Sequence, residues 1–108
     1  MTVSGRAKEA LEPFGLPVTD GFFPEKEKEY LILKIPTESG ANFGDDRPLF
    51  TVAEIEVHWF LPMDVNYHDK KNQIREALFQ AGFTYPDVTV ITDPKQIRHI
   101  IFECEYAE

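Results

Sequence analysis

The fold of this chain is decided by residues 49–61, which read LFTVAEIEVHWFL. Successive side chains of a β-strand point to opposite faces of a sheet, so residues two positions apart share a face. One such set is mostly apolar and comprises Thr51, Ala53, Ile55, Val57 and Trp59. The other set is polar and comprises Glu54, Glu56 and His58. The alternation predicts a strand from Leu49 to Leu61 with one face on a hydrophobic core and the other in water or at an interface.

A second strand is expected just before this one, at Tyr30–Ile35, where apolar residues again alternate. Pro36 should end it, because proline has no backbone N–H to donate to a sheet. Residues 37–48 are polar and turn-forming apart from Phe43. The sequence therefore predicts a long β-hairpin whose connecting loop has about a dozen residues, a length typical of functional or mobile loops.

The N-terminal segment has the pattern of a short helix over residues 2–13. Ser4 is a suitable capping residue, and Pro13 with Gly15 should end the helix. The following residues 15–29 contain proline, glycine and alternating charges, which are typical of a solvated connector.

The second half of the chain predicts one helix and two further strands. Asp69 is placed to cap a helix that runs to Ala81, and Gly82 follows at its C-terminal end. Strands are expected at Val88–Thr92 and Arg98–Tyr106. The element order α-β-β-α-β-β predicts an α+β fold, with a mostly antiparallel sheet covered on one face by two helices.

Composition is consistent with one soluble domain spanning residues 1–108. Hydrophobic residues make up 43% and aromatic residues 13% of the chain, enough for one core. The 19 acidic and 11 basic side chains give a formal net charge of -8. Phosphate-binding surfaces need clustered Lys and Arg, so specific nucleic-acid binding and binding to anionic membranes are not expected. An acidic wall would instead let DNA pass without sticking.

The single cysteine, Cys104, lies in an apolar alternation and is expected to be a buried, inert thiol. The N-terminus lacks the apolar run of a signal peptide, and no stretch approaches the ~20 apolar residues of a transmembrane helix. These features predict a reducing, cytoplasmic setting.

No enzymatic motif emerges from the chain. Ser39 and the threonines lack the context of an activated nucleophile, and Gly40 and Gly44 are spaced too loosely for a phosphate-binding loop. We therefore predict no catalytic residue, no metal ligand and no cofactor.

One polar cluster leaves an alternative open. His99, Glu103 and Glu105 would share a face with Glu54, Glu56 and His58 if their strands were neighbours, and imidazoles with carboxylates bind zinc in other proteins. The interpretation we favour is an exposed polar sheet face that serves solubility or subunit contact. Glu54, Glu56 and His58 are therefore candidate interface residues.

The predicted hairpin loop supplies the other candidate interface. Phe43 would be an exposed apolar anchor, and Asp45, Asp46 and Arg47 would form a polar turn beside it. The pattern predicts a docking tip on the hairpin.

A family resemblance rests on five segments that together cover nearly the whole chain. They are residues 14–18 (FGLPV), 43–49 (FGDDRPL), 57–62 (VHWFLP), 70–84 (KKNQIREALFQAGFT) and 99–105 (HIIFECE). These segments resemble small tail components of siphophages and prophages of Gram-positive bacteria.

The resemblance implies a non-enzymatic virion protein of the tail-terminator or tail-to-head-joining class, whose members are small α+β proteins that cap the tail tube as a hexameric ring. Its partners would be further copies of itself, the tail tube and the head connector, with DNA passing an acidic lumen. Its location would be the host bacterial cytoplasm during assembly and then the virion tail. The alternatives are a tail-assembly chaperone or adaptor that does not stay in the virion and, less favoured, a metal-binding protein that uses the Glu/His face.

Overall fold

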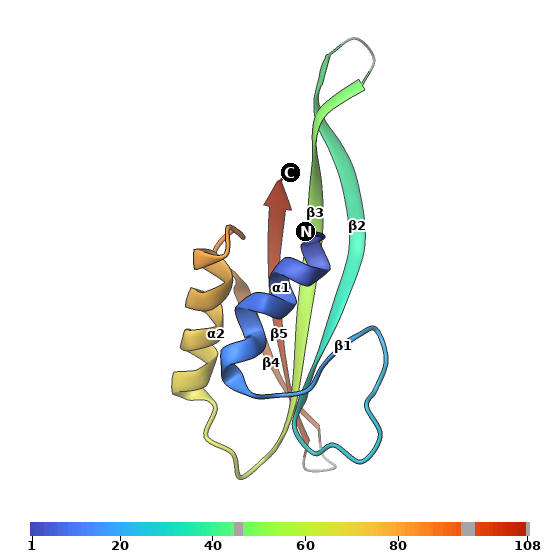
Figure 1. Ribbon diagram of the computed structural model, residues 1–108. Coiled ribbons are helices and arrows are strands. Elements are labelled where there is room, and N and C mark those ends of the chain that lie inside the picture. The colour runs from blue at the N-terminus through green and yellow to red at the C-terminus, as the bar shows by residue number, and fades with distance from the viewer. Residues whose placement is uncertain (45–46, 94–96, 108) are drawn as a thin grey trace.

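The computed structural model describes residues 1–44, 47–93 and 97–107 (Figure 1). The elements along the chain are α1 (Val3–Leu11), η1 (Glu12–Phe14), β1 (Val18–Asp20), β2 (Tyr30–Gly44), β3 (Arg47–Pro62), α2 (His68–Gln80), β4 (Asp87–Asp93) and β5 (Ile97–Ala107). The sheet has the order β1-β2-β3-β5-β4, in which β1 runs parallel to β2 and the other neighbours are antiparallel. The predicted α+β class and mostly antiparallel sheet are confirmed.

The hydrophobic core lies between one face of the sheet and the two helices, which are on the same side of it (Figure 1). The helices contribute Val3, Ala7, Leu11, Ile74 and Leu78. The sheet contributes alternate residues of its three central strands, Leu31, Leu33, Ala53, Ile55, Val57, Trp59, Leu61, Ile100, Phe102 and Cys104. Removing this apolar surface from water is the main favourable term in folding.

Strand β3 has the predicted alternation. Ala53, Ile55, Val57 and Trp59 are all buried in the core. On the other face Glu54 is exposed, whereas His58 is only 7% exposed, which the sequence did not predict. The pattern correctly assigned residues to the two faces, but it did not indicate that His58 on the second face is buried.

The predicted loop over residues 37–48 is wrong, because β2 continues through it to Gly44 and β3 already begins at Arg47. Pro36 does not end the strand, since the register between β2 and β3 shifts between Lys34 and Thr37 and the proline lies in that irregularity. Strand β1 pairs with β2 only as far as Leu33, so Pro36 lies beyond that pairing and within a bulge, and both edge strands and bulges tolerate proline.

The extended hairpin gives the molecule an elongated shape of 54 × 24 × 23 Å. The radius of gyration is 15.0 Å, compared with about 13 Å for a compact domain of this size. Strand β3 pairs with β5 only as far as Val52, opposite Ala107, so the hairpin beyond that pair projects from the body (Figure 1). We call residues 38–44 and 47–51 the β2–β3 arm.

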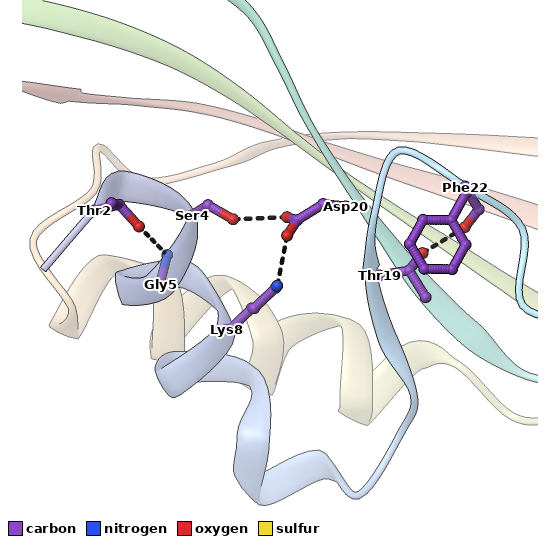
Figure 2. A network of polar contacts seen from close by, with 7 residues as sticks. All are labelled: Thr2, Ser4, Gly5, Lys8, Thr19, Asp20 and Phe22. Carbon is purple, nitrogen blue, oxygen red and sulfur yellow. Dashed lines mark hydrogen bonds and ion pairs between the residues drawn. The ribbon is translucent and has the colours of Figure 1, made fainter.

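The connector predicted over residues 15–29 contains a strand that the sequence analysis missed. Strand β1 is held against α1 by Asp20, whose carboxylate accepts hydrogen bonds from Ser4 Oγ at 2.6 Å and Lys8 Nζ at 2.5 Å (Figure 2). Ser4 is therefore not the helix cap. Thr2 caps α1 instead, because its Oγ1 accepts a hydrogen bond from the Gly5 amide at 2.9 Å.

The second helix begins at His68, one residue before the predicted cap Asp69, and its N-cap residue Tyr67 makes no side-chain cap hydrogen bond. Its end is as predicted, since Gly82 follows the helix with a positive φ of 103°. That conformation is rare for residues with a Cβ atom. A Cβ atom at Gly82 would also lie 3.0 Å from Cε2 of Tyr106.

We therefore expect Gly82→Ala to lower the free energy of unfolding by about 2–3 kcal/mol, through backbone strain and contact with Tyr106. Gly15→Ala is the matched control, because Gly15 also has a positive φ but has no atom within 4 Å of an added Cβ. The control should lose only about 1 kcal/mol. Urea unfolding followed by circular dichroism measures both, and equal losses would show that Tyr106 contributes nothing.

Candidate functional site

The sheet face opposite the two helices, which we call the helix-free face, carries the candidate site. Strand register arranges its side chains in cross-strand rows. These rows are Tyr30–Phe60–His99–Ile91, Ile32–His58–Ile101–Thr89, Lys34–Glu56–Glu103–Asp87 and Glu54–Glu105. The face is thus aromatic and apolar at one end and acidic at the other.

The aromatic end is a stack of three rings from three strands. The Phe60 ring lies 4.1 Å from His99 and 5.1 Å from Tyr30, with interplanar angles of 16° and 22°. Phe23, from the connector before β2, packs edge-on against Phe60 at 5.5 Å and remains 66% exposed. Such offset and edge contacts are the favoured arrangements of aromatic pairs. A shallow groove of about 290 Å³ borders the stack, lined by Glu27, Lys28, Tyr30, Phe60, Pro62 and Ile97.

A chain of polar side chains crosses the middle of the face. His58 Nε2 lies 2.8 Å from Glu56 Oε1, and His58 Nδ1 lies 2.7 Å from His99 Nε2. Because an ionised carboxylate only accepts, neutral His58 carries its proton on Nε2 and accepts at Nδ1 from His99. The buried imidazole of His58 therefore has both nitrogens bonded, which explains how a polar residue is tolerated at 7% exposure.

The pKa of His99 is lowered from its ordinary value of 6.5, first by burial and then by the charges of His58 and Lys34. The folded chain consequently binds fewer protons than the unfolded chain over the interval between the two pKa values, so stability must fall as pH falls there. Above the unfolded value, this group has no effect on the pH dependence.

We expect the free energy of unfolding to decrease as the pH falls below the ordinary histidine value of about 6.5, mainly through His99. His99→Gln should flatten this part of the profile, since the amide does not titrate. His68→Gln, a change at an exposed histidine, is the control and should leave the slope unchanged. Urea unfolding across this pH range measures the slope, and a parallel decline in wild type and His99→Gln would contradict the assignment.

The expectation that the Glu/His residues of two strands share a face is confirmed, because β3 and β5 are neighbours and His58 meets His99. Metal binding gains no support from this geometry. Both ring nitrogens of His58 are already bonded, and among the residues whose side chains the structure describes, no group of three His, Cys, Asp or Glu could hold a metal ion.

The acidic end of the face gathers carboxylates from three strands around a hollow of about 190 Å³. Its acidic lining is Glu54, Glu56, Asp87, Glu103 and Glu105. Lys34 is the basic residue opposite Glu56 in the β2–β3 register. Clustered carboxylates of this kind attract basic side chains and repel DNA.

The candidate residues of the hairpin tip receive only a partial placement. Asp45 and Asp46 lie outside the described residues. Phe43 and Arg47 belong to the ends of β2 and β3, where the backbone of Phe43 pairs with Pro48 and that of Gly44 with Arg47. The docking tip therefore remains a prediction, located at the far end of the β2–β3 arm.

Cys104 is buried as predicted, at 6% exposure. Burial, and then the nearby charge of Glu105, raise the pKa of its thiol to about 12. Because the thiolate is the reactive species, this cysteine is inert near neutral pH.

Phe60 is a residue of the candidate site that the sequence analysis did not single out. Phe60 lies on the helix-free face because it shares the parity of His58, and that parity was readable from the sequence. The stacking of Phe60 with His99 was not readable, since it depends on which residue of β5 lies opposite.

No described helix is long and apolar enough to cross a membrane. No protein-family model matches the sequence, and a comparison with curated proteins finds no match.

Proposed function

We propose that this chain is a non-enzymatic virion assembly protein, a tail terminator or head–tail joining component that caps the tail tube through ring-forming contacts. The resemblance of its sequence segments to small siphophage and prophage tail components motivates the assignment. The observation that carries it is the β2–β3 arm, which projects from the body of a molecule 54 Å long.

A projecting arm supports a role in assembly because it combines reach with open strand edges. Strand β2 has its β1 partner only at Leu31–Leu33, and β3 has its β5 partner only from Val52 onward. Within the described residues, the outer edges of the arm have no partner strand. Open edges that are this long are sites where another chain can add a strand.

The helix-free face supports the same role as a second contact surface. Its exposed apolar residues include Phe23, Ile91 and Ile97, which are 66%, 43% and 46% exposed. In its centre, His58 is hydrogen-bonded to both His99 and Glu56. A hydrogen-bonded chain of this kind suits a rigid contact surface better than a proton-transfer site. Its acidic end would line a channel that DNA passes without sticking.

The test is the location and copy number of the protein in assembled particles. We expect antibody labelling to place it at the head-proximal end of purified tails, and native mass spectrometry to find a hexamer when tail tubes are present. Heterologous contacts close into a ring at only one rotation, which would fix that number. Absence from purified particles, together with binding to unassembled tail proteins, would favour the alternative of a tail-assembly chaperone or adaptor.

A further inference from the structure

Strand β4 is the outermost strand on its side of the sheet, and it lacks the features that usually protect an edge strand from pairing with another chain. Between Asp87 and Asp93 it contains only uncharged β-branched residues, Val88, Thr89, Val90, Ile91 and Thr92. Val90 is 41% and Ile91 43% exposed. Natural edge strands are usually blunted by lysine, proline, a bulge or short length, since open backbone groups recruit further strands.

The opposite edge of the same sheet has these protections up to the β2–β3 arm, whose own edges are open. Strand β1 has three residues, and the part of β2 that follows contains an irregularity around Pro36. Strand β4 has seven residues and, within them, no proline, no lysine and no break in its pairing with β5. The contrast indicates that the β4 edge is kept open for a strand.

Apolar side chains lie on both sides of this edge. Val90 has the parity of the core face. Ile91 and Ile97 have the parity of the helix-free face. A strand added here would place alternate side chains beside both groups, so its centre must be uncharged on both faces.

The end of the edge at Asp87 is acidic. Asp87 lies opposite Glu103 in the β4–β5 register, and Glu56 is the next residue in the same row. Both Asp87 and Glu103 are exposed, and among the described residues neither forms an ion pair. They line the acidic hollow together with Glu56, so a cation on an added strand would pair with Asp87 and would be attracted at longer range by the other two carboxylates.

We propose that the outer edge of β4 accepts an extended strand from a partner protein, with an uncharged β-branched centre and a Lys or Arg opposite Asp87. Main-chain hydrogen bonds would supply affinity, and the cation would fix the register. The inference goes beyond the proposed tail role, because the edge would bind such a strand whether or not the chain stays in a virion.

A second copy of this chain is the less suitable occupant. In a centred antiparallel pairing of two β4 strands, Asp87 of one copy would lie opposite Asp93 of the other at both ends, and like charges directly opposite are destabilising. Each copy also carries a formal charge of -8. Basic ends on the added strand remove this conflict.

The test uses the full chain and a synthetic peptide, Lys-Val-Thr-Val-Thr-Val-Lys. We expect its addition to shift the amide resonances of residues 88–92 and to slow their hydrogen exchange. The same peptide with Glu at both ends should bind at least about tenfold more weakly. Raising the salt concentration should weaken the Lys peptide because the carboxylates are exposed.

Two controls distinguish strand pairing from nonspecific binding of the peptide. Asp87→Lys should remove most of the preference for the Lys peptide, and this exposed substitution should leave the fold intact. A Lys peptide N-methylated at every core residue keeps the charges and side chains but cannot donate main-chain hydrogen bonds, and it should not bind. The proposal would be overturned by equal binding of the Lys and Glu peptides, or by no binding at all. It would also be overturned if the resonance shifts lay on β2 instead of β4, or if the chain associated with itself through β4 without any peptide.

Discussion

Trp59→Ala should lower the free energy of unfolding by about 3–5 kcal/mol, the range for truncating a large aromatic residue in a core. Trp59 is 0% exposed and lies at the centre of the sheet, where it stacks with Phe102 at 6.5 Å. Its Nε1–H donates to Glu29 Oε2 at 2.9 Å, and Lys70 Nζ lies 5.7 Å from the ring centroid. Truncation removes the apolar contact and the hydrogen bond together.

Urea unfolding followed by far-ultraviolet circular dichroism is the measurement, since the variant removes the only tryptophan and with it the usual fluorescence signal. Trp59→Phe separates the two contributions, because it keeps most of the apolar area and loses the bond to Glu29. We expect it to lose about 1–2 kcal/mol. Ile91→Ala, at an exposed position of β4, should change stability by less than about 0.5 kcal/mol. A Trp59→Ala loss as small as that of Ile91→Ala would contradict the position of Trp59 in the core.

The core of this fold was predictable because it depends on local alternation. The buried residues Ala53 to Trp59 of β3 lie two positions apart, and every residue of that set packs on the helix side. Period-two patterns are imposed by strand geometry alone, so they survive without knowledge of neighbouring strands. The same holds for the helix before Gly82, whose apolar face and terminal glycine are local signals.

The β2–β3 arm was not predictable by the same reasoning. Residues such as Gly40, Ala41 and Asn42 have weak strand propensity and signal a turn. They adopt β structure because β3 lies opposite and pairs with them, which is a tertiary effect. Strand β1 was missed for a related reason, since its three residues are held by pairing with β2 and by Asp20 binding to α1.

Part of the candidate site was likewise predictable from local spacing, and part depends on how the strands pair. Glu54, Glu56 and His58 could be assigned to one face from sequence spacing. The bond between His58 and His99 depends on the register of β3 and β5, which brings together residues 41 positions apart. The openness of the β4 edge likewise requires the strand order, because the sequence of β4 alone resembles that of a central strand.

Charge reversal on the helix-free face should impair assembly without harming the fold. Glu54 is exposed and lies opposite Glu105, so Glu54→Lys replaces a like-charge pair with an opposite-charge pair. We expect stability to be unchanged or raised by up to about 0.5 kcal/mol. If the acidic end of the face contacts a basic partner, the same substitution should lower assembly at least about tenfold, because an attractive contact becomes repulsive.

Glu9→Lys is the matched control, since Glu9 is an exposed residue of α1 on the other side of the sheet and the change in charge is identical. Complementation of a phage or prophage that lacks the protein measures assembly as the yield of complete particles, and cosedimentation with isolated tail tubes measures binding directly. The Glu54→Lys defect in both assays should diminish when a compensating acidic residue replaces the partner's basic one. If Glu54→Lys and Glu9→Lys perform alike while both fold normally, the acidic end of the helix-free face is a solvated surface and the contact must be assigned to the β2–β3 arm alone.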